Sequence, residues 1–258
     1  MRFVARLFTL FSLTLLLNAP AAFARSFEQI EKDKTITVAT EGQFAPFNFF
    51  QGSKLTGFEV ELADEIFRRL GIHVDWKVIN FETLLTGLQQ GRWDFVIASH
   101  AITPEREKVV LFASPHYCTG SVIITSDPAI HGVADLKDKT VAVATGTTSY
   151  DWVKANVPQV KDVKNFPQDP DARAAVQTGR ADAWVTDRIT ATASLKTNSQ
   201  GDLKILPALL YRERVAAVAA KGNEPLVDQW NKTLSALVAD GTYDKLSRKW
   251  LGADYACH

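Results

Sequence analysis

The segment Lys34–Thr40 reads KTITVAT, and almost the same letters, KTVAVAT, return at Lys139–Thr145. A second element follows each copy in the same order, GRWDFVIAS at Gly91–Ser99 and GRADAWVTD at Gly179–Asp187. In both copies an apolar strand comes first, and later a glycine ends a helix and leads into a short apolar strand. One such match can arise by chance, whereas two in the same order predict two lobes of similar construction.

Strands and helices alternate through both halves of the chain. Residues 58–70 place an apolar side chain at every fourth position, the spacing of an amphipathic helix, and residues 74–78 alternate as a strand does. The order strand, helix, strand, helix, strand predicts an α/β fold in which each lobe has a mostly parallel sheet flanked by helices. The second lobe repeats this order, with strands expected at 141–144 and 163–166 and helices at 150–156 and 171–178.

Two extended segments, Tyr117–Ile124 and Tyr211–Ala220, are rich in β-branched or small apolar residues and connect the two halves. Two connections predict a hinge made of two strands. The expected division of the chain is a first lobe over 25–117, a hinge strand at 118–124, a second lobe over 125–212, and a return strand with C-terminal helices packing on the first lobe over 213–258.

The composition is that of an ordinary globular protein. Of 258 residues, 46% are hydrophobic and 22% are charged, with 14 Gly and 10 Pro, which excludes disorder, collagen and a simple coiled coil. The chain has 29 basic and 29 acidic side chains, so it lacks the basic surface with which proteins bind nucleic acid. No Cys/His cluster has the spacing of zinc ligands, and no cofactor is expected.

The first residues differ from the rest. Arg2 and Arg6 precede the apolar run Leu7–Leu17, and the small residues Ala22 and Ala24 follow. This pattern is typical of a secretory signal peptide, here residues 1–24. A membrane anchor is the alternative, but about eleven apolar residues reach only about 16 Å as a helix, roughly half of a hydrocarbon core. We therefore expect an exported, soluble protein.

Cys118 and Cys257 are the two cysteines of the chain. In an oxidising compartment an even pair is more often bridged than free, so a disulfide is expected. The alternative is two unrelated thiols. A bridge closing a loop of roughly 140 residues would stabilise the fold by about 4 to 5 kcal/mol, and measured gains are often smaller.

The residues that follow each predicted strand form the candidate site, because ligands bind at the carboxyl ends of strands in sheets of this kind. Arg106, with the turn that ends at Thr148, offers a forked cationic donor and backbone N–H groups to a carboxylate. Asp187 and Ser99 offer acceptor oxygens to an ammonium group. Two aromatic faces, Phe44 and Phe81, and one further carboxylate, Glu41, complete a set that can clamp a small zwitterion.

Several linked motifs resemble the bacterial extracellular solute-binding proteins of family 3, the periplasmic receptors of polar amino-acid ABC transporters. They span nearly the whole chain after the signal peptide. The motifs are ATEGQFAPFNF at 39–49, LTGFEVELA at 55–63, ITPER at 102–106, FASPHY at 112–117 and KWLG at 249–252. The resemblance implies a two-lobed periplasmic-binding-protein architecture, type II-like, in a monomer that works with an inner-membrane ABC permease.

The resemblance also implies roles for single positions. Arg106 matches the residue that binds the α-carboxylate and Asp187 the one that binds the α-ammonium. Thr148 matches a turn residue whose N–H holds the carboxylate. Ser99, Phe44 and Phe81 match ligand-facing and aromatic positions. Glu41 falls where receptors for basic or amide amino acids place an acidic contact to the side chain.

The sequence departs from the family pattern at two positions. Ala101 stands where many relatives have Ser or Thr, so a hydroxyl partner for the ammonium is missing. His100 stands where Met or Leu is common. The ligand expected is a polar L-amino acid, most consistent with Arg or Lys, with Gln or His as competitors.

Two other functions share this architecture. Exported cyclohexadienyl (arogenate) dehydratases resemble the family and use a glutamate in the second-lobe turn as general acid, where this chain has Ser149. A ligand-sensing signalling module is the other alternative, and such modules are usually fused to membrane spans. The sequence therefore favours a receptor without enzymatic activity.

Overall fold

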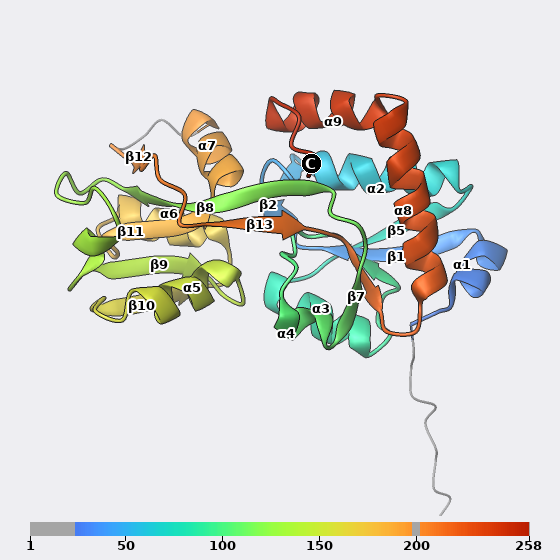
Figure 1. Cartoon of the computed structure of the whole chain (residues 1–258), viewed down its shortest axis with the longest axis horizontal. Coiled ribbons are helices and arrows are strands. Elements are labelled where there is room, and N and C mark those ends of the chain that lie inside the picture. Colours follow the sequence, from blue (N-terminus) through green and yellow to red (C-terminus); the bar gives the residue numbers. More distant parts are fainter. Residues whose placement is uncertain (1–23, 198–201, 258) are drawn as a thin grey trace, which may run out of the picture.

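The computed structural model describes residues 24–197 and 202–257, which form two α/β lobes joined by a pair of antiparallel strands (Figure 1). The expected signal peptide lies, except for residue 24, outside the described residues. Within the described part of the chain, none of the helices combines the length and the apolar character that crossing a bilayer requires.

The first lobe is built on a five-stranded sheet whose order is β5-β1-β6-β14-β7. The strands β5, β1 and β6 run parallel, and β14 is antiparallel to both β6 and β7. The bounds are β1 Thr35–Thr40, β5 His73–Val78, β6 Phe95–Val96, β7 Val110–Phe112 and β14 Val218–Ala220. The predicted parallel core of this lobe is therefore present, and the returning chain adds an antiparallel strand to it.

Helices cover both faces of the first sheet. Their bounds are α1 Phe27–Asp33, α2 Phe58–Arg69, α3 Phe81–Gln89, α4 Pro104–Glu107, α8 Glu224–Ala239 and α9 Thr242–Leu251. The last two helices, α8 and α9, pack against α2 (Figure 1), so the C-terminal segment lies against the first lobe. Phe67, Phe95 and Trp230 meet in its core, where all three are fully buried.

The second lobe has a sheet of order β10-β9-β11-β8-β12, to which β13 is added by pairing with β8. The strands β10, β9 and β11 are parallel, and β8 is antiparallel to its neighbours. The bounds are β8 Tyr117–Thr125, β9 Thr140–Ala144, β10 Asp162–Phe166, β11 Ala183–Asp187, β12 Lys204–Ile205 and β13 Tyr211–Val215. The helices are η1 Val133–Leu136, α5 Thr148–Asn156, α6 Asp169–Gln177 and α7 Arg188–Thr197.

The repeat noticed in the sequence has the same structural role in each lobe. Gly91 and Gly179 both follow a helix, with φ of 68° and 69° respectively, values that favour glycine. The aspartates that come next, Asp94 and Asp182, each accept a hydrogen bond from a backbone N–H of the opening strand of their lobe, at 2.8 and 2.7 Å. The same short motif thus binds the opening strand in each lobe.

A three-stranded sheet, β2 (Gln43–Phe44), β3 (Asn48–Gln51) and β4 (Lys54–Thr56), follows β1 and was not expected from the sequence. Its strands are too short to show a period, and Gly52 at φ 62° makes its second turn. This small sheet carries Phe44 to the edge of the first lobe.

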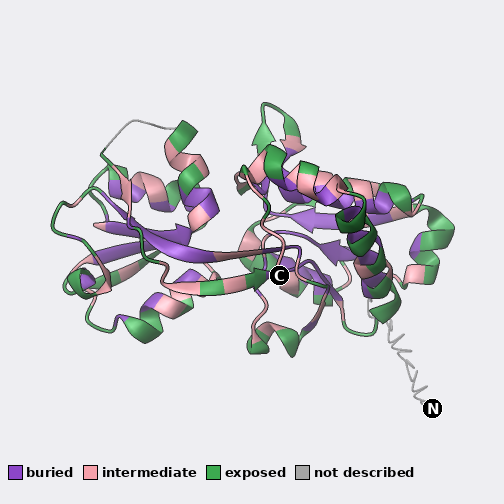
Figure 2. Cartoon of the chain, turned by 45° about the horizontal axis from the view of Figure 1, so that its top comes forward, coloured by how far each residue is buried: buried purple, intermediate pink, exposed green. Residues whose placement is uncertain are grey.

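The hinge consists of β8 and β13, which pair from Tyr117↔Val215 to Ser121↔Tyr211. Both run between the lobes in Figure 1, and Figure 2 shows that most of β8 is buried. The disulfide between Cys118 and Cys257 is present, as predicted, and joins the C-terminal segment to the start of β8. The N–H of Cys118 also donates to the carbonyl of Tyr255 at 2.9 Å.

Candidate ligand-binding site

A cavity lies between the lobes, in front of the hinge. Seven of the eight residues predicted for the site line it: Glu41, Phe44, Phe81, Ser99, Arg106, Thr148 and Asp187. They come from both lobes, and the hinge strands contribute further lining residues such as Thr119 and Glu213. The structure therefore brings these seven residues together around one cavity.

Arg106 is the cationic group of the cavity wall. It lies in α4, and the hydroxyl of the N-cap residue Thr103 accepts the Arg106 N–H at 3.2 Å. The guanidinium donates to the carbonyl of Ala101 at 3.0 Å and, across the gap between the lobes, to the carbonyl of Gly146 at 3.0 Å. Burial lowers the pKa of Arg106 from its ordinary value, and a guanidinium remains charged nevertheless.

Phe81 supports Arg106 from the first lobe. The Arg106 Cζ lies 5.8 Å from the centroid of the Phe81 ring, a cation–π distance. On the Phe81 ring also stacks His100, with centroids 4.4 Å apart and planes at 18°. Burial, and secondarily Arg106, hold the pKa of His100 well below its usual range, so His100 is a neutral packing partner of the aromatic wall.

Asp187 ends β11 and also begins α7. Its Oδ1 accepts the N–H groups of Ile189 at 2.7 Å and Thr190 at 3.0 Å, which caps the helix, and its Oδ2 accepts the Thr119 hydroxyl at 2.5 Å. Burial raises its pKa to about 6, so the group is mainly ionised at pH 7. Asp187 is thus both a helix cap and a carboxylate that faces the cavity.

Glu41 follows β1 and is 6% exposed. Burial, with the charges of Asp169 and Glu59 in addition, raises its pKa to about 8. Within residues 24–197 and 202–257, none donates a hydrogen bond to its carboxyl group. The Glu41 oxygens are not among the fully enclosed polar atoms that lack a partner, so the carboxyl is open to the cavity. A cationic group placed beside it there would favour its ionised form.

Two hydrogen bonds to the buried Glu59 hold Ser99 in place. One Glu59 oxygen accepts the Ser99 N–H at 2.8 Å and the other its hydroxyl at 3.1 Å. The same carboxyl accepts from Asn48 Nδ2 and lies 2.8 Å from His116 Nε2. Ser99 has φ 55°, an uncommon value for a residue other than glycine, and these bonds fix it there.

Thr148 is the first residue of α5. Thr147 caps this helix, its hydroxyl accepting the Tyr150 N–H at 3.3 Å. The free N–H groups of a helix start favour an anion. The Thr148 hydroxyl donates to Glu213, and the Ser149 hydroxyl lies 3.1 Å from the Tyr211 hydroxyl.

Ala101 is the predicted residue that does not line the cavity. It is buried, bridges to Val215 of the hinge strand, and contributes its carbonyl oxygen to Arg106. Ala101 therefore contributes to the site through its backbone carbonyl, which holds Arg106, and not through its side chain.

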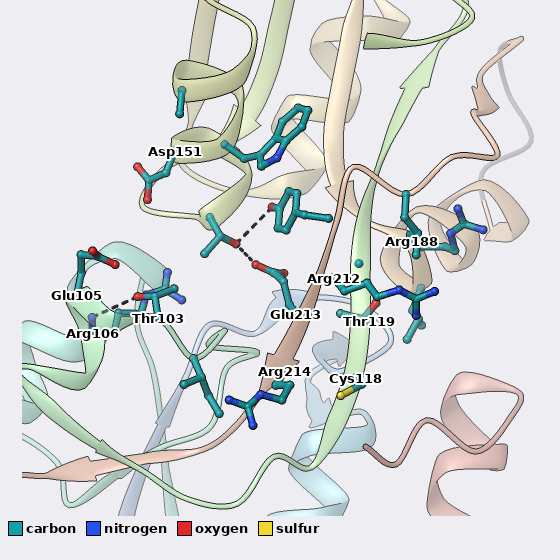
Figure 3. Close-up of a pocket in the computed structure, with 18 of the residues that line it drawn as sticks. Thr103, Glu105, Arg106, Cys118, Thr119, Asp151, Arg188, Arg212, Glu213 and Arg214 are labelled. Atoms are coloured by element: carbon teal, nitrogen blue, oxygen red, sulfur yellow. Dashed lines mark hydrogen bonds between the residues drawn. The ribbon is translucent and has the colours of Figure 1, made fainter. Parts of the chain in front are cut away.

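Two carboxyl groups of the cavity were missed from the sequence. Asp169 begins α6, accepts from Trp184 Nε1 at 2.9 Å and from the Thr186 hydroxyl at 2.6 Å, and burial raises its pKa to about 6. Glu213 lies in the middle of β13 and lines the cavity together with Thr148. It also lines a larger pocket, which it shares with Arg106 and Arg188 (Figure 3). The strand-end rule, applied to residues 163–166, leads to Asp169, but no pattern in the sequence points to Glu213.

The charged groups of the cavity wall, among the described residues, are four carboxyl groups and one guanidinium. The carboxyl groups are Glu41, Asp169, Asp187 and Glu213, and the guanidinium is Arg106. The guanidinium bonds to Gly146, just before α5 begins, and the four carboxyl groups line other parts of the cavity wall. A dipolar molecule can place its negative end at Arg106 and Thr148 and its positive end at Asp187. The surplus of carboxyl groups favours a second positive charge on such a molecule.

The chain is similar to proteins of known class over most of its length. The profile of the bacterial extracellular solute-binding proteins, family 3, matches residues 36–253. The L-cystine-binding protein TcyJ of Escherichia coli K12 is 33% identical over 231 residues, which cover 88% of this chain and 86% of that protein.

Two solved structures are similar to the whole fold. An ancestral arginine-binding protein bound to arginine is 37% identical, with a TM-score of 0.81, covering 85% of this chain and 99% of that one. The ancestral amino-acid-binding protein AncCDT-1, described as a precursor of cyclohexadienyl dehydratase, is 33% identical with a TM-score of 0.81, covering 87% and 98%. On the profile match and the two-lobed fold together, the chain belongs to the bacterial extracellular solute-binding proteins, family 3.

Proposed function

We propose that this protein is a periplasmic receptor that captures a basic L-amino acid, arginine or lysine, with glutamine and histidine as weaker competitors, and delivers it to an ABC permease of the inner membrane. The lobes close about the β8–β13 hinge, and the ligand stabilises the closed form because it contacts both lobes. No covalent step and no cofactor are part of this function.

The observation that carries the proposal is Glu41. Its carboxyl is buried in the cavity without a hydrogen bond from the described residues, and its pKa is raised to about 8. A guanidinium or ammonium group at the end of a ligand side chain would donate hydrogen bonds to it and supply the opposite charge. Ala144, which lines the same cavity, offers no cation to an acidic ligand.

The remaining charges fit the common part of an amino acid. Arg106 and the start of α5 at Thr148 suit the α-carboxylate, and Asp187 suits the α-ammonium. Phe44 and Phe81 offer faces for the aliphatic stem and the cation of the side chain.

A second candidate function is the dehydratase reaction, because AncCDT-1 shares the fold at 33% identity. Such a reaction needs a protonatable group in the site, and Glu41 and Glu213 have raised pKa values. The place of the expected general acid holds Ser149, which favours the receptor. Incubation with prephenate or arogenate separates the two, since the receptor leaves both unchanged.

Titration calorimetry tests the proposal. The chain without its signal peptide, stripped of co-purified ligand by partial unfolding and refolding, is titrated with the twenty amino acids and L-cystine. We expect a Kd of about 1 μM or tighter, about −8 kcal/mol, for arginine or lysine. Tightest binding of an acidic or apolar amino acid contradicts the proposal.

Three variants refine this titration. Arg106→Met abolishes detectable binding, whereas Arg92→Met, at an exposed arginine outside the cavity, leaves the Kd unchanged. Glu41→Gln weakens arginine at least tenfold and glutamine less than threefold, because only arginine carries a charge for this carboxyl. Equal losses for both ligands would assign Glu41 a role other than side-chain recognition.

A further inference from the structure

Glu213 is a carboxyl group that the proposed capture of an amino acid leaves without a role. It lies in β13 opposite Thr119 of β8. Its side chain lines the cavity, and its Oε1 accepts a hydrogen bond from the Thr148 hydroxyl. The neighbouring Arg212 and Arg214 are exposed and line a larger pocket together with Glu213 (Figure 3).

Four arginines, Arg106, Arg188, Arg212 and Arg214, line the larger pocket together with Glu213, and Arg106 is the one whose charge acts on its pKa. Arg106 of α4 faces it and favours its ionised form, while Asp187 at the end of β11 disfavours that form. The hydroxyl groups of Tyr117 in β8 and Tyr211 in β13 are the other titratable groups that sense its charge. Burial is the largest effect and raises the pKa of Glu213 above its ordinary value.

The proposed site for the ligand's α-carboxylate uses the same two groups, Arg106 and the Thr148 turn. A bound α-carboxylate would therefore bring a second negative charge to the one guanidinium that lines the cavity within the described residues. Two carboxylates that share one site do not both remain ionised when water is excluded; one of them binds a proton. A protonated Glu213 can then donate a hydrogen bond to the carboxylate beside it.

We propose that Glu213 takes up a proton from solvent when an amino acid binds, so that capture of the ligand's carboxylate is coupled to protonation of the hinge strand. This inference rests on the proposed function, because it requires the α-carboxylate to lie at Arg106 and Thr148. It makes Glu213 a residue that selects for the ligand's charge state and that weakens binding as the pH rises.

The number of protons exchanged on binding tests this inference. Calorimetric titration with L-arginine at pH 7.0 in two buffers of different ionisation enthalpy gives that number for wild type, for Glu213→Gln and for Glu105→Gln, an exposed carboxyl of α4 near Arg106. Any proton that Glu41 releases to solvent when the cationic ligand binds is common to all three proteins and cancels in the comparison. We expect wild type and Glu105→Gln to take up at least about 0.3 more protons per ligand than Glu213→Gln.

The affinities give a second readout. At pH 8.5 Glu213→Gln should bind arginine at least threefold more tightly than wild type, and at pH 5.5 the two should agree within twofold. Equal proton numbers, or loss of arginine binding in Glu213→Gln, overturn the inference. Loss of arginine binding in this variant would mean that the ionised Glu213 carboxylate binds the ligand.

The protonation of Glu213 can also be measured directly in the wild-type protein, without a substitution. Carbon-13 NMR titration of the assigned Glu213 carboxyl should show its pKa rising by at least one unit when arginine is added. An unchanged or lower pKa overturns the inference. If wild type binds no amino acid, or if Arg106→Met retains full affinity, the proposed function fails as well; if binding depends on Arg106 but the proton numbers agree, only the role of Glu213 fails.

Discussion

At the scale of single residues, Glu41 links ligand binding to stability. Its ordinary pKa of 4.5 is raised to about 8 in the folded protein, chiefly by burial. Between these values the unfolded chain releases its proton and the folded protein keeps it. Folding stability therefore falls as the pH rises through this range, the reverse of the effect of an ion-paired carboxylate.

The variant Glu41→Gln should remove this fall in folding stability at high pH. At pH 7.5 we expect its free energy of unfolding to exceed that of wild type by about 1 to 3 kcal/mol, and at pH 4.5 the two should be similar. Urea denaturation at both pH values measures it, with Glu31→Gln, an exposed glutamate of α1, as control. A gain at pH 7.5 no larger than that of the control contradicts a buried, protonated Glu41.

Asp187 requires a choice of substitution, since it caps α7 as well as facing the cavity. Asp187→Ala removes the cap and the acceptor for Thr119, so it should cost about 1 to 3 kcal/mol of stability in addition to ligand binding. Asp187→Asn keeps an oxygen for the cap and should lose less than 1 kcal/mol while weakening ligand binding at least a hundredfold. Thermal unfolding and calorimetry separate the two effects, and full affinity in Asp187→Asn would remove this residue from the site.

Elements of secondary structure show where packing overrides local preference. Gly87 lies inside α3, where alanine would ordinarily be preferred by about 1 kcal/mol. A Cβ at this position would come within 2.1 Å of the Trp93 ring, which is 5% exposed and donates its indole N–H to the carbonyl of Leu84 at 3.0 Å. The helix therefore keeps a glycine so that the tryptophan can pack against its backbone.

Gly87→Ala should consequently destabilise the first lobe by about 1 to 3 kcal/mol. Thr86→Ala, an exposed neighbour in the same helix, should be neutral or slightly stabilising. Chemical denaturation of both variants measures the difference. A Gly87→Ala protein as stable as Thr86→Ala would show that Trp93 can move aside without cost.

The disulfide acts at the junction of two elements, the start of β8 and the segment after α9. Cys118 and Cys257 are 139 residues apart in the chain, so the bridge restricts the unfolded state strongly. Replacing both by serine should lower the free energy of unfolding by about 2 to 5 kcal/mol. Urea denaturation tests this, and reduction of the wild type should give a similar loss; a change below 1 kcal/mol in both would contradict it.

For the whole molecule, the sequence predicted the architecture because the two lobes repeat one strand-and-helix motif. Asp94 and Asp182 hold the opening strands, and the glycines before them end helices, so similar letters correspond to similar structure. The short sheet β2–β4 was not predicted, since two- to four-residue strands carry no period.

The candidate site could be predicted to the extent that its residues stand at strand ends. Glu41, Ser99 and Asp187 do, and they line one cavity. Glu213 stands in mid-strand between two exposed arginines and enters the site only because β13 pairs with β8, which lies about ninety residues earlier in the chain. Pairing between distant strands is set by tertiary structure, so local patterns did not reveal it.

The central claim concerns both lobes together, namely that one dipolar ligand is held between Arg106 of the first lobe and Asp187 of the second while its side chain reaches Glu41. A crystal structure of the protein grown with L-arginine tests this most directly. We expect the α-carboxylate within hydrogen-bond distance of Arg106 and the Thr148 N–H, the α-ammonium at Asp187, and the guanidinium at Glu41. Arginine bound in the reverse orientation, or outside the cavity between the lobes, would contradict it.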